Sequence, residues 1–142
     1  MKREKNFFVS YCMSFSPVYV KETDTLLNAI EAMKNFKIDS IPVINDGFSV
    51  IGHLTKKKIR DIFKLNCCKS VRLLKDFKVS DIIGKDRLPI VFYPKMRIKE
   101  AYSFMKHFNN ICIPIVNEPW EKKMLGVIWL DDVLSVMKEL SA

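Results

Sequence analysis

Ile41-Pro42-Val43-Ile44-Asn45 returns 72 residues later as Ile113-Pro114-Ile115-Val116-Asn117. The same offset pairs further residues: Pro17 with Pro89, Ala29 with Ala101, Met33 with Met105 and Phe36 with Phe108. A match at one fixed offset indicates an internal repeat, and a period this long indicates one duplicated module rather than an array of short units. Two copies of one module in a small chain usually pack about a pseudo-twofold axis. Any ligand cleft is then expected between the copies.

Each copy is predicted to run β-α-β-β-α. The first copy is expected to contain a strand at 17–20, a helix ending near Phe36, a strand at 41–44, a hairpin turn at Asn45-Asp46-Gly47, a strand at 48–54 and a second helix. Thr23 and Thr55 are the expected N-caps of its two helices. The second copy repeats the order with a strand at 90–93, a helix at about 95–108, strands at 113–116 and 124–129, and a last helix.

The repeats divide the chain into three segments. Residues 8–66 form repeat 1, residues 67–78 a connector with some helical character, and residues 79–142 repeat 2. Val9-Ser10 reappears as Val79-Ser80 at the start of the second copy. The basic N-terminus is therefore expected to lead into the fold rather than to be a secretory signal.

Composition predicts a globular chain with a hydrophobic core. Hydrophobic residues make up 49% of the 142 residues, with ten Phe and seven Met, so disorder is not expected. No apolar run approaches the ~20 residues of a membrane-spanning helix. The four cysteines, Cys12, Cys67, Cys68 and Cys112, form no C-x-x-C pair. We therefore expect reduced thiols, no metal site and a cytoplasmic location.

Charge and motif content limit the classes of function. A formal net charge of +8 favours anionic partners: nucleotides, nucleic acid or an acidic protein surface. With four Gly in all, a glycine-rich phosphate loop of the P-loop type is excluded. No nucleophile with a paired base and no paired carboxylates are recognised, and His53 and His107 stand alone in the sequence. The chain is therefore predicted to be no enzyme, with no catalytic residues and no required cofactor.

Each copy resembles a CBS domain, the β-α-β-β-α module named after cystathionine β-synthase, and the tandem resembles a Bateman module. The resemblance is carried by Thr23-Asp24-Thr25-Leu26, by the Ile-Pro-Val/Ile strand that ends in Asn, and by the motif Gly-h-h-Thr/Ser-x-x-Asp, where h is hydrophobic. It covers residues 9–140 and implies an α/β fold of the α+β type with two CBS repeats. It also implies a homodimer formed through exposed helix faces.

In this family, two clefts between the copies commonly bind AMP, ADP, ATP or S-adenosylmethionine. The Thr or Ser of the motif faces the phosphates, and the Asp accepts hydrogen bonds from the ribose hydroxyls. A hydroxyl and main-chain N–H groups at a helix N-terminus suit an anion. A carboxylate can accept bonds from two vicinal hydroxyls.

Neither copy carries the complete motif. The first reads Gly52-His53-Leu54-Thr55-Lys56-Lys57-Lys58, with Lys58 in place of the Asp. The second reads Gly126-Val127-Ile128-Trp129-Leu130-Asp131-Asp132, with Trp129 in place of the Thr. The two clefts are therefore expected to differ chemically.

Transferred residue by residue, the resemblance implies two ligand sites. Site A would combine Val18, Ile38, Asp39, Ser40, Trp129, Asp131 and Asp132. Site B would combine Thr55, Lys57, Lys58, Ile90, Ile111 and Cys112. Site A suits a ribose and an aromatic base, with Asp132 on the hydroxyls and Trp129 stacking. Site B has lost its ribose acceptor and gained cations, which suit phosphates.

Structural explanations for the same residues remain open. Asp132 in the first turn of a helix is favoured by the helix dipole without any ligand. Trp129 at a strand end can fill a core, Thr55 is a cap in either case, and the three lysines can form a solvated basic patch.

The leading hypothesis is a stand-alone sensor that binds an adenosine-type ligand between its repeats and acts on a separate effector protein. The alternatives are a ligand-free dimerisation or docking scaffold and, ranked last, a nucleic-acid-binding protein. Nucleic-acid binding needs aromatic residues among the lysines, and near residues 56–64 only Phe63 is available, at a position expected to be buried.

Overall fold

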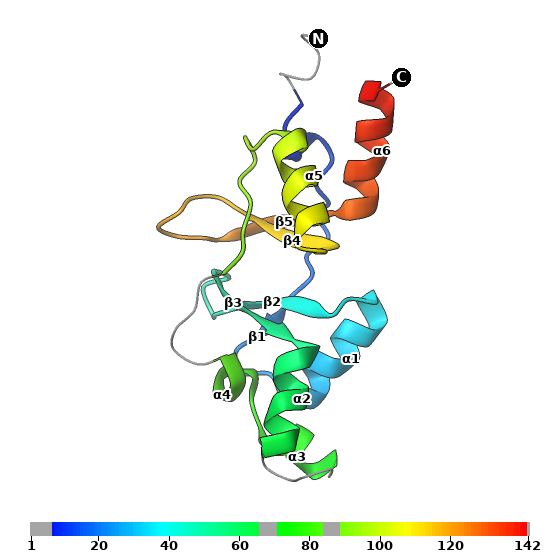
Figure 1. The fold of residues 1–142 in the computed structure, drawn as a ribbon. Helices are drawn as coiled ribbons and strands as arrows, with labels where there is room; N and C mark the ends of the chain where they lie inside the picture. The colour runs from blue at the N-terminus through cyan, green and yellow to red at the C-terminus, as the bar shows by residue number, and fades with distance from the viewer. Residues whose placement is uncertain (1–6, 66–70, 84–88, 142) are drawn as a thin grey trace. The chain divides into compact units, whose positions relative to one another are not determined.

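The computed structural model describes residues 7–65, 71–83 and 89–141, which divide into two compact units (Figure 1). One unit is Val18–Pro89, and the other combines Met1–Pro17 with Ile90–Ala142. Each unit contains helices and a small β-sheet. The expected α/β class of the α+β type is therefore confirmed. The repeats are defined by sequence similarity and the units by contacts between residues. Their boundaries therefore differ, since residues 8–17 belong to repeat 1 but lie in the unit that contains Ile90–Ala142.

In the unit Val18–Pro89, three strands form the sheet in the order β1-β2-β3. Strand β1 (Val20–Lys21) pairs in parallel with β2 (Ser40–Ile44), and β2 pairs antiparallel with β3 (Val50–Thr55). The remaining elements are the helices α1 (Leu26–Phe36), α2 (Lys56–Leu65), α3 (Val71–Asp76) and α4 (Val79–Ile83). Residues 41–44 of β2 are fully apolar and buried, so this strand lies at the centre of the core.

The turn predicted at Asn45-Asp46-Gly47 is confirmed. The N–H of Asn45 donates to the carbonyl of Ser49 at 3.0 Å, and the N–H of Ser49 donates to Oδ1 of Asn45 at 3.0 Å. Phe48 takes a positive φ of 64°, so the returning strand begins at Val50 rather than at residue 48.

The N-cap of α1 is Thr25, and the prediction of Thr23 was wrong. Oγ1 of Thr25 accepts a hydrogen bond from the N–H of Asn28 at 3.2 Å. Asp24 turns the chain just before the helix, since its carboxylate accepts from the N–H of Lys21 at 2.9 Å. This local turn delays the first helical residue to Leu26. The helix ends at Phe36 as predicted.

The second unit pairs β4 (Cys112–Val116) with β5 (Met124–Trp129), beside α5 (Ile98–His107) and α6 (Leu130–Ser141). The strand predicted at 90–93 is reduced to one parallel bridge between Phe92 and Ile115. Pro94 has no N–H with which to extend this ladder. Both sheets are irregular at matching places, after Val43 and after Ile115.

A short segment docks on the start of the first helix of each unit: residues 77–79 on α1 and residues 7–9 on α5. We call these the leading segments, because each comes just before or at the start of one repeat in the sequence. In the unit Val18–Pro89, the N–H of Leu26 donates to Phe77 at 3.0 Å, and the N–H of Val79 donates to Asp24 at 2.8 Å. In the second unit the corresponding bonds join Ile98 to Phe7 at 3.1 Å and Val9 to Met96 at 2.8 Å. The segment before each repeat thus serves the other repeat, whose first helical N–H it satisfies.

The helix α5 has this docking bond but no side-chain cap. Its N-cap residue, Arg97, makes no capping hydrogen bond, unlike Thr25 of α1. The carbonyl of Phe7 already accepts from the first N–H of α5.

The leading segment of the second unit continues along β5. Ser14 and Val127 exchange two main-chain hydrogen bonds, of 2.7 and 2.9 Å. A Cβ added at Gly126 would overlap the carbonyl oxygen of Ser14 and lie 2.8 Å from Cε of Met13. A side chain at position 126 is therefore incompatible with this pairing.

No helix in the described ranges combines the length and apolar character needed to cross a membrane.

Gly126→Ala is expected to lower the free energy of unfolding by about 1–3 kcal/mol, because the new methyl group must displace the backbone at Ser14. Urea unfolding measures this change. Hydrogen exchange should show faster exchange of the Ser14 and Val127 amides. Gly47→Ala is the matched control, since its Cβ would meet only Oδ1 of Asn45 at 3.4 Å. Equal stability of the two variants would contradict the account.

Candidate functional site

The strand-to-helix junctions β3–α2 and β5–α6 carry the residues of the incomplete motifs. At the first junction, Oγ1 of Thr55 accepts a hydrogen bond from the N–H of Lys58 at 3.1 Å. The predicted N-cap at Thr55 is therefore confirmed. The N–H of Lys56 donates to the carbonyl of Asp39 at 3.0 Å, and Thr55 pairs in register with Ser40.

Two of the three lysines at the start of α2 have a carboxylate partner. Nζ of Lys56 lies 3.2 Å from Oδ1 of Asp39, and Nζ of Lys57 lies 3.7 Å from Oδ2 of Asp61. These ion pairs are solvent-exposed and typically stabilise by less than about 1 kcal/mol each. They offset the repulsion between the lysines and the positive end of the helix dipole. Lys58 forms no ion pair within the described part of the chain.

The second junction has the same main-chain geometry and a different set of side chains. The N–H of Leu130 donates to the carbonyl of Ile111 at 2.8 Å, and Trp129 pairs in register with Cys112. Trp129 is half-buried, whereas Asp131 and Asp132 are exposed in the first turn of α6. This helix therefore begins with two carboxylates where α2 begins with three lysines.

Asp132 also acts on the leading segment of its own unit. Burial, and secondarily the negative charge of Asp132, raise the pKa of the Cys12 thiol to about 11. Burial alone raises the pKa of Cys112 to about 12. Both cysteines are free and stay protonated at neutral pH, so neither is an activated nucleophile. Residue spacing alone does not indicate that the charge of Asp132 acts on Cys12.

Each unit brings together residues predicted for different sites. Asp39 and Ser40, assigned to site A, lie beside Lys56 and Thr55 in one unit. In the other unit, Trp129 of site A pairs with Cys112 of site B. The grouping of residues from both units into one site stays a prediction.

The apolar residues assigned to the two sites differ in exposure. Val18 and Ile38 of site A are 2% and 1% exposed, so their side chains belong to the core of their unit. Ile90 and Ile111 of site B are 39% and 40% exposed. Only the site B pair therefore offers side-chain surface to a ligand.

In the described ranges, no three His, Cys, Asp or Glu side chains gather closely enough to bind a metal ion. The predictions for Cys67 and Cys68, and for burial of the Phe63 side chain, fall outside the described residues.

Residues 9–64 match the family model described as the CBS domain. The chain is 27% identical over 126 residues to inosine-5'-monophosphate dehydrogenase of Aquifex aeolicus. This alignment covers 89% of the chain but only 24% of that enzyme. The chain thus spans about a quarter of the length of this relative.

Solved structures of CBS-domain pairs share the fold. CBSX2 of Arabidopsis thaliana, solved in complex with AMP, superposes with a TM-score of 0.71 at 17% identity, covering 96% of this chain and all of that one. A CBS-domain pair solved with 5'-methylthioadenosine and S-adenosyl-L-methionine gives a TM-score of 0.67 at 14% identity, covering 94% and 97% of the two chains.

Alkylation by iodoacetamide at pH 8 should be roughly a hundredfold slower at Cys12 than in the unfolded chain, because a thiol whose pKa rises from 9.0 to about 11 is rarely ionised there. Asp132→Asn should lower the pKa of Cys12 and speed its alkylation. Cys112 is the internal control, since burial alone raises its pKa. Site-resolved mass spectrometry measures both rates, and an unchanged rate at Cys12 in the variant would refute the effect of the Asp132 charge on this thiol.

Proposed function

The chain is a tandem CBS-domain protein, and from this premise we propose that it is a regulatory module that binds an adenosine-type ligand between its repeats. The observation that carries the proposal is its fold, which is shared with CBS-domain pairs solved with AMP and with S-adenosyl-L-methionine. Ligands of this class are anions or carry ribose hydroxyls, and the two junctions differ in which of these features they suit.

The β5–α6 junction suits the ribose. Asp132 presents an exposed carboxylate in the first turn of α6, where it can accept bonds from two vicinal hydroxyls. Trp129 is half-buried and offers a face for an aromatic base. Within site A, Val18 and Ile38 would contribute main-chain contacts, because their side chains are buried.

The β3–α2 junction suits phosphates. Thr55 begins the α2 helix, and Lys57 and Lys58 are exposed beside it. Lys57 can exchange its carboxylate partner for a phosphate at little cost, since exposed ion pairs contribute less than about 1 kcal/mol. Helix dipole and lysine charge then act on the same anion.

Signalling would follow from a shift in population. A ligand that contacts both repeats favours the arrangement that it binds best. We propose that the output passes to a separate effector protein and that the chain itself is no enzyme. A homodimer and a cytoplasmic location remain predictions.

A ligand-free scaffold is the second candidate. The ion pairs Lys56–Asp39 and Lys57–Asp61 favour it, because they give two of the three cations a partner within the chain. The hydroxyl of Thr55 is likewise occupied by its own helix.

A thermal-shift screen separates the two candidates. The purified chain is tested with AMP, ADP, ATP, GTP, NADH and S-adenosylmethionine at physiological salt. A ligand at a hundred times its dissociation constant stabilises by about 2.7 kcal/mol, so the midpoint should rise by several degrees. A selective rise with one adenosine ligand supports the sensor, and a flat response across the panel supports the scaffold.

Asp132→Ala should weaken binding of the ligand found in that screen by about 1–3 kcal/mol, which is roughly five- to 150-fold in the dissociation constant. The reason is the loss of the acceptor for the ribose hydroxyls. Isothermal titration calorimetry measures the affinity. Glu139→Ala on the exposed side of the same helix is the control and should bind like the wild type. Equal affinity in the two variants would remove Asp132 from the site.

A further inference from the structure

The loop between β4 and β5 carries the most exposed large apolar side chain in the part of the chain that the structure describes. Trp120 is 81% exposed, although tryptophan is highly buried on average in folded proteins. Figure 1 shows the loop reaching out from the two strands, on the side away from α6. We call residues 118–122 the tryptophan loop. Its indole contributes little to the core of its unit, so the exposure needs another explanation.

The hairpin of the sister unit shows how much of this loop the fold requires. The N–H of Asn45 donates to the carbonyl of Ser49, and the N–H of Asn117 donates to that of Lys123, at 3.0 Å in both hairpins. The side chains repeat the match, since Oδ1 of each Asn accepts from the N–H of the same partner residue, at 3.0 and 2.9 Å. The first hairpin closes on this framework with residues 46–48 alone. The longer tryptophan loop is therefore not needed to join β4 to β5.

The two hairpins also differ in the use of their aromatic residue. In the first, the ring of Phe48 packs edge-on against Tyr19, with 5.1 Å between the ring centres. In the second, Trp120 makes no ring contact within the described ranges. The shorter hairpin thus covers its own unit, whereas the tryptophan loop presents its aromatic side chain to solvent.

Hydrogen bonds hold the tryptophan loop in one shape. Oδ1 of Asn117 accepts from the N–H of Glu118 at 2.7 Å. The carbonyl of Glu118 accepts from the N–H groups of Glu121 and Lys122, at 3.2 and 2.7 Å. Nζ of Lys122 donates to the carbonyl of Pro119 at 2.6 Å. The loop is therefore preorganised, and a partner that binds it loses little affinity to the ordering of the chain.

The charges of the loop distinguish between classes of partner. Nζ of Lys123 lies 3.7 Å from Oε2 of Glu121, and Nζ of Lys122 is bound to the carbonyl of Pro119. Glu118 forms no ion pair in the part of the chain that the structure describes. A base-stacking site for nucleic acid, or a contact with anionic lipid, needs free cations beside the aromatic ring. The loop instead offers a free carboxylate close to the indole in the sequence, which suits a cationic group of a protein.

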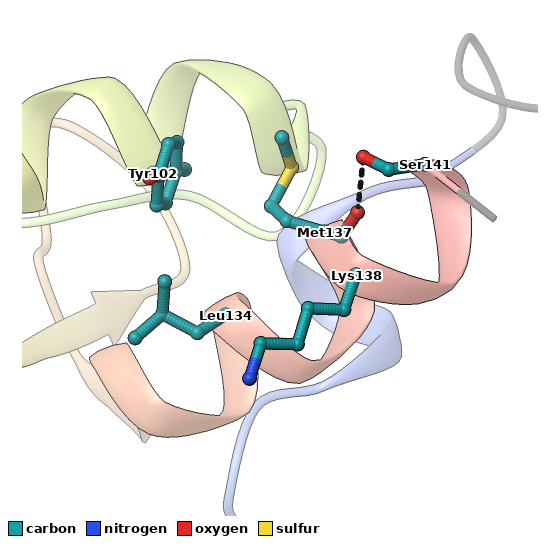
Figure 2. Close-up of a pocket in the computed structure, with 5 residues that line it drawn as sticks. All are labelled: Tyr102, Leu134, Met137, Lys138 and Ser141. Atoms are coloured by element: carbon teal, nitrogen blue, oxygen red, sulfur yellow. Dashed lines mark hydrogen bonds between the residues drawn. The ribbon is translucent and has the colours of Figure 1, made fainter.

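The tryptophan loop is separate from the helix surface of its unit. A groove between α5 and α6 is lined by Tyr102, Leu134, Met137, Lys138 and Ser141. Figure 2 shows Tyr102 facing Leu134 across this groove. The exposed faces of such helices are where we expect the homodimer to form. A further partner needs a surface outside them, and the tryptophan loop provides one.

We propose that the tryptophan loop is the docking element for a second protein. An apolar pocket of that protein takes the Trp120 side chain and accepts a hydrogen bond from its indole N–H, and a Lys or Arg at the rim faces Glu118. Tryptophan is among the residues that most often dominate a protein interface. The loop and the β5–α6 junction lie at opposite ends of β5. The docking therefore needs no adenosine ligand and extends the proposed function without resting on it.

Site-specific photo-cross-linking in cells of the source organism tests the contact. The full chain carries Trp120→p-benzoylphenylalanine. The control carries Phe15→p-benzoylphenylalanine, at an aromatic residue that is 75% exposed outside the loop. A protein that is cross-linked from position 120 and not from position 15 is identified by mass spectrometry and purified. Isothermal titration calorimetry then measures its dissociation constant for the wild-type chain.

Trp120→Ala should weaken binding of that purified protein by at least about thirtyfold, with no change in the thermal midpoint of the chain, because the side chain is exposed. Glu118→Lys should weaken it by about tenfold, and Phe15→Ala should leave it unchanged. Equal affinity of Trp120→Ala and the wild type, or no protein cross-linked from position 120, would overturn the proposal. Cross-links to nucleic acid or lipid, or only to a second copy of the chain, would overturn it as well.

Discussion

The main-chain bonds between each leading segment and the first helix of the other repeat are the constraint on which both units depend. A helix start leaves N–H groups without partners inside the helix. Here the carbonyls of Phe77 and Phe7 accept from the first of these groups, in α1 and α5. The same segments place Val79 and Val9 in the cores of their units, where both are fully buried. Each repeat is therefore completed by residues that its own sequence does not contain.

Most of the fold could be predicted because its signals are local or periodic. The repeat, the strand Ile41–Ile44 and the turn at Asn45 follow from residue types at fixed spacings, and they were found within one or two residues. The errors have physical causes as well. Thr23 and Thr25 are equally good caps by type, and the side-chain turn at Asp24 decides between them. The strand near Phe92 shrank to one bridge because Pro94 cannot extend it.

The places of the motif residues at the two strand-to-helix junctions were predictable, whereas the ion pairs around them were not. The motif placed Thr55 and Trp129 at equivalent junctions, and the sheet registers with Ser40 and Cys112 agree. The partners of Lys56 and Lys57 depend on side-chain directions that spacing alone does not fix. The docking of each leading segment on the helix of the other repeat could not be predicted either. Hydrogen bonds between main-chain atoms can be made by almost any residue type, so the sequence does not reveal them. The effect of the Asp132 charge on the Cys12 thiol follows from the same docking.

The docking of each leading segment on the other repeat also determines the order in which the two units can fold during synthesis. The unit Val18–Pro89 is contiguous, so all its residues have left the ribosome once Pro89 has emerged. Ser14 emerges earlier but pairs with Val127, which is made only after the whole of that unit. The segment around Ser14 therefore stays without its partner strand while the unit Val18–Pro89 folds. Closing so long a loop is slow, which makes the pairing of Ser14 with β5 the natural last step of folding.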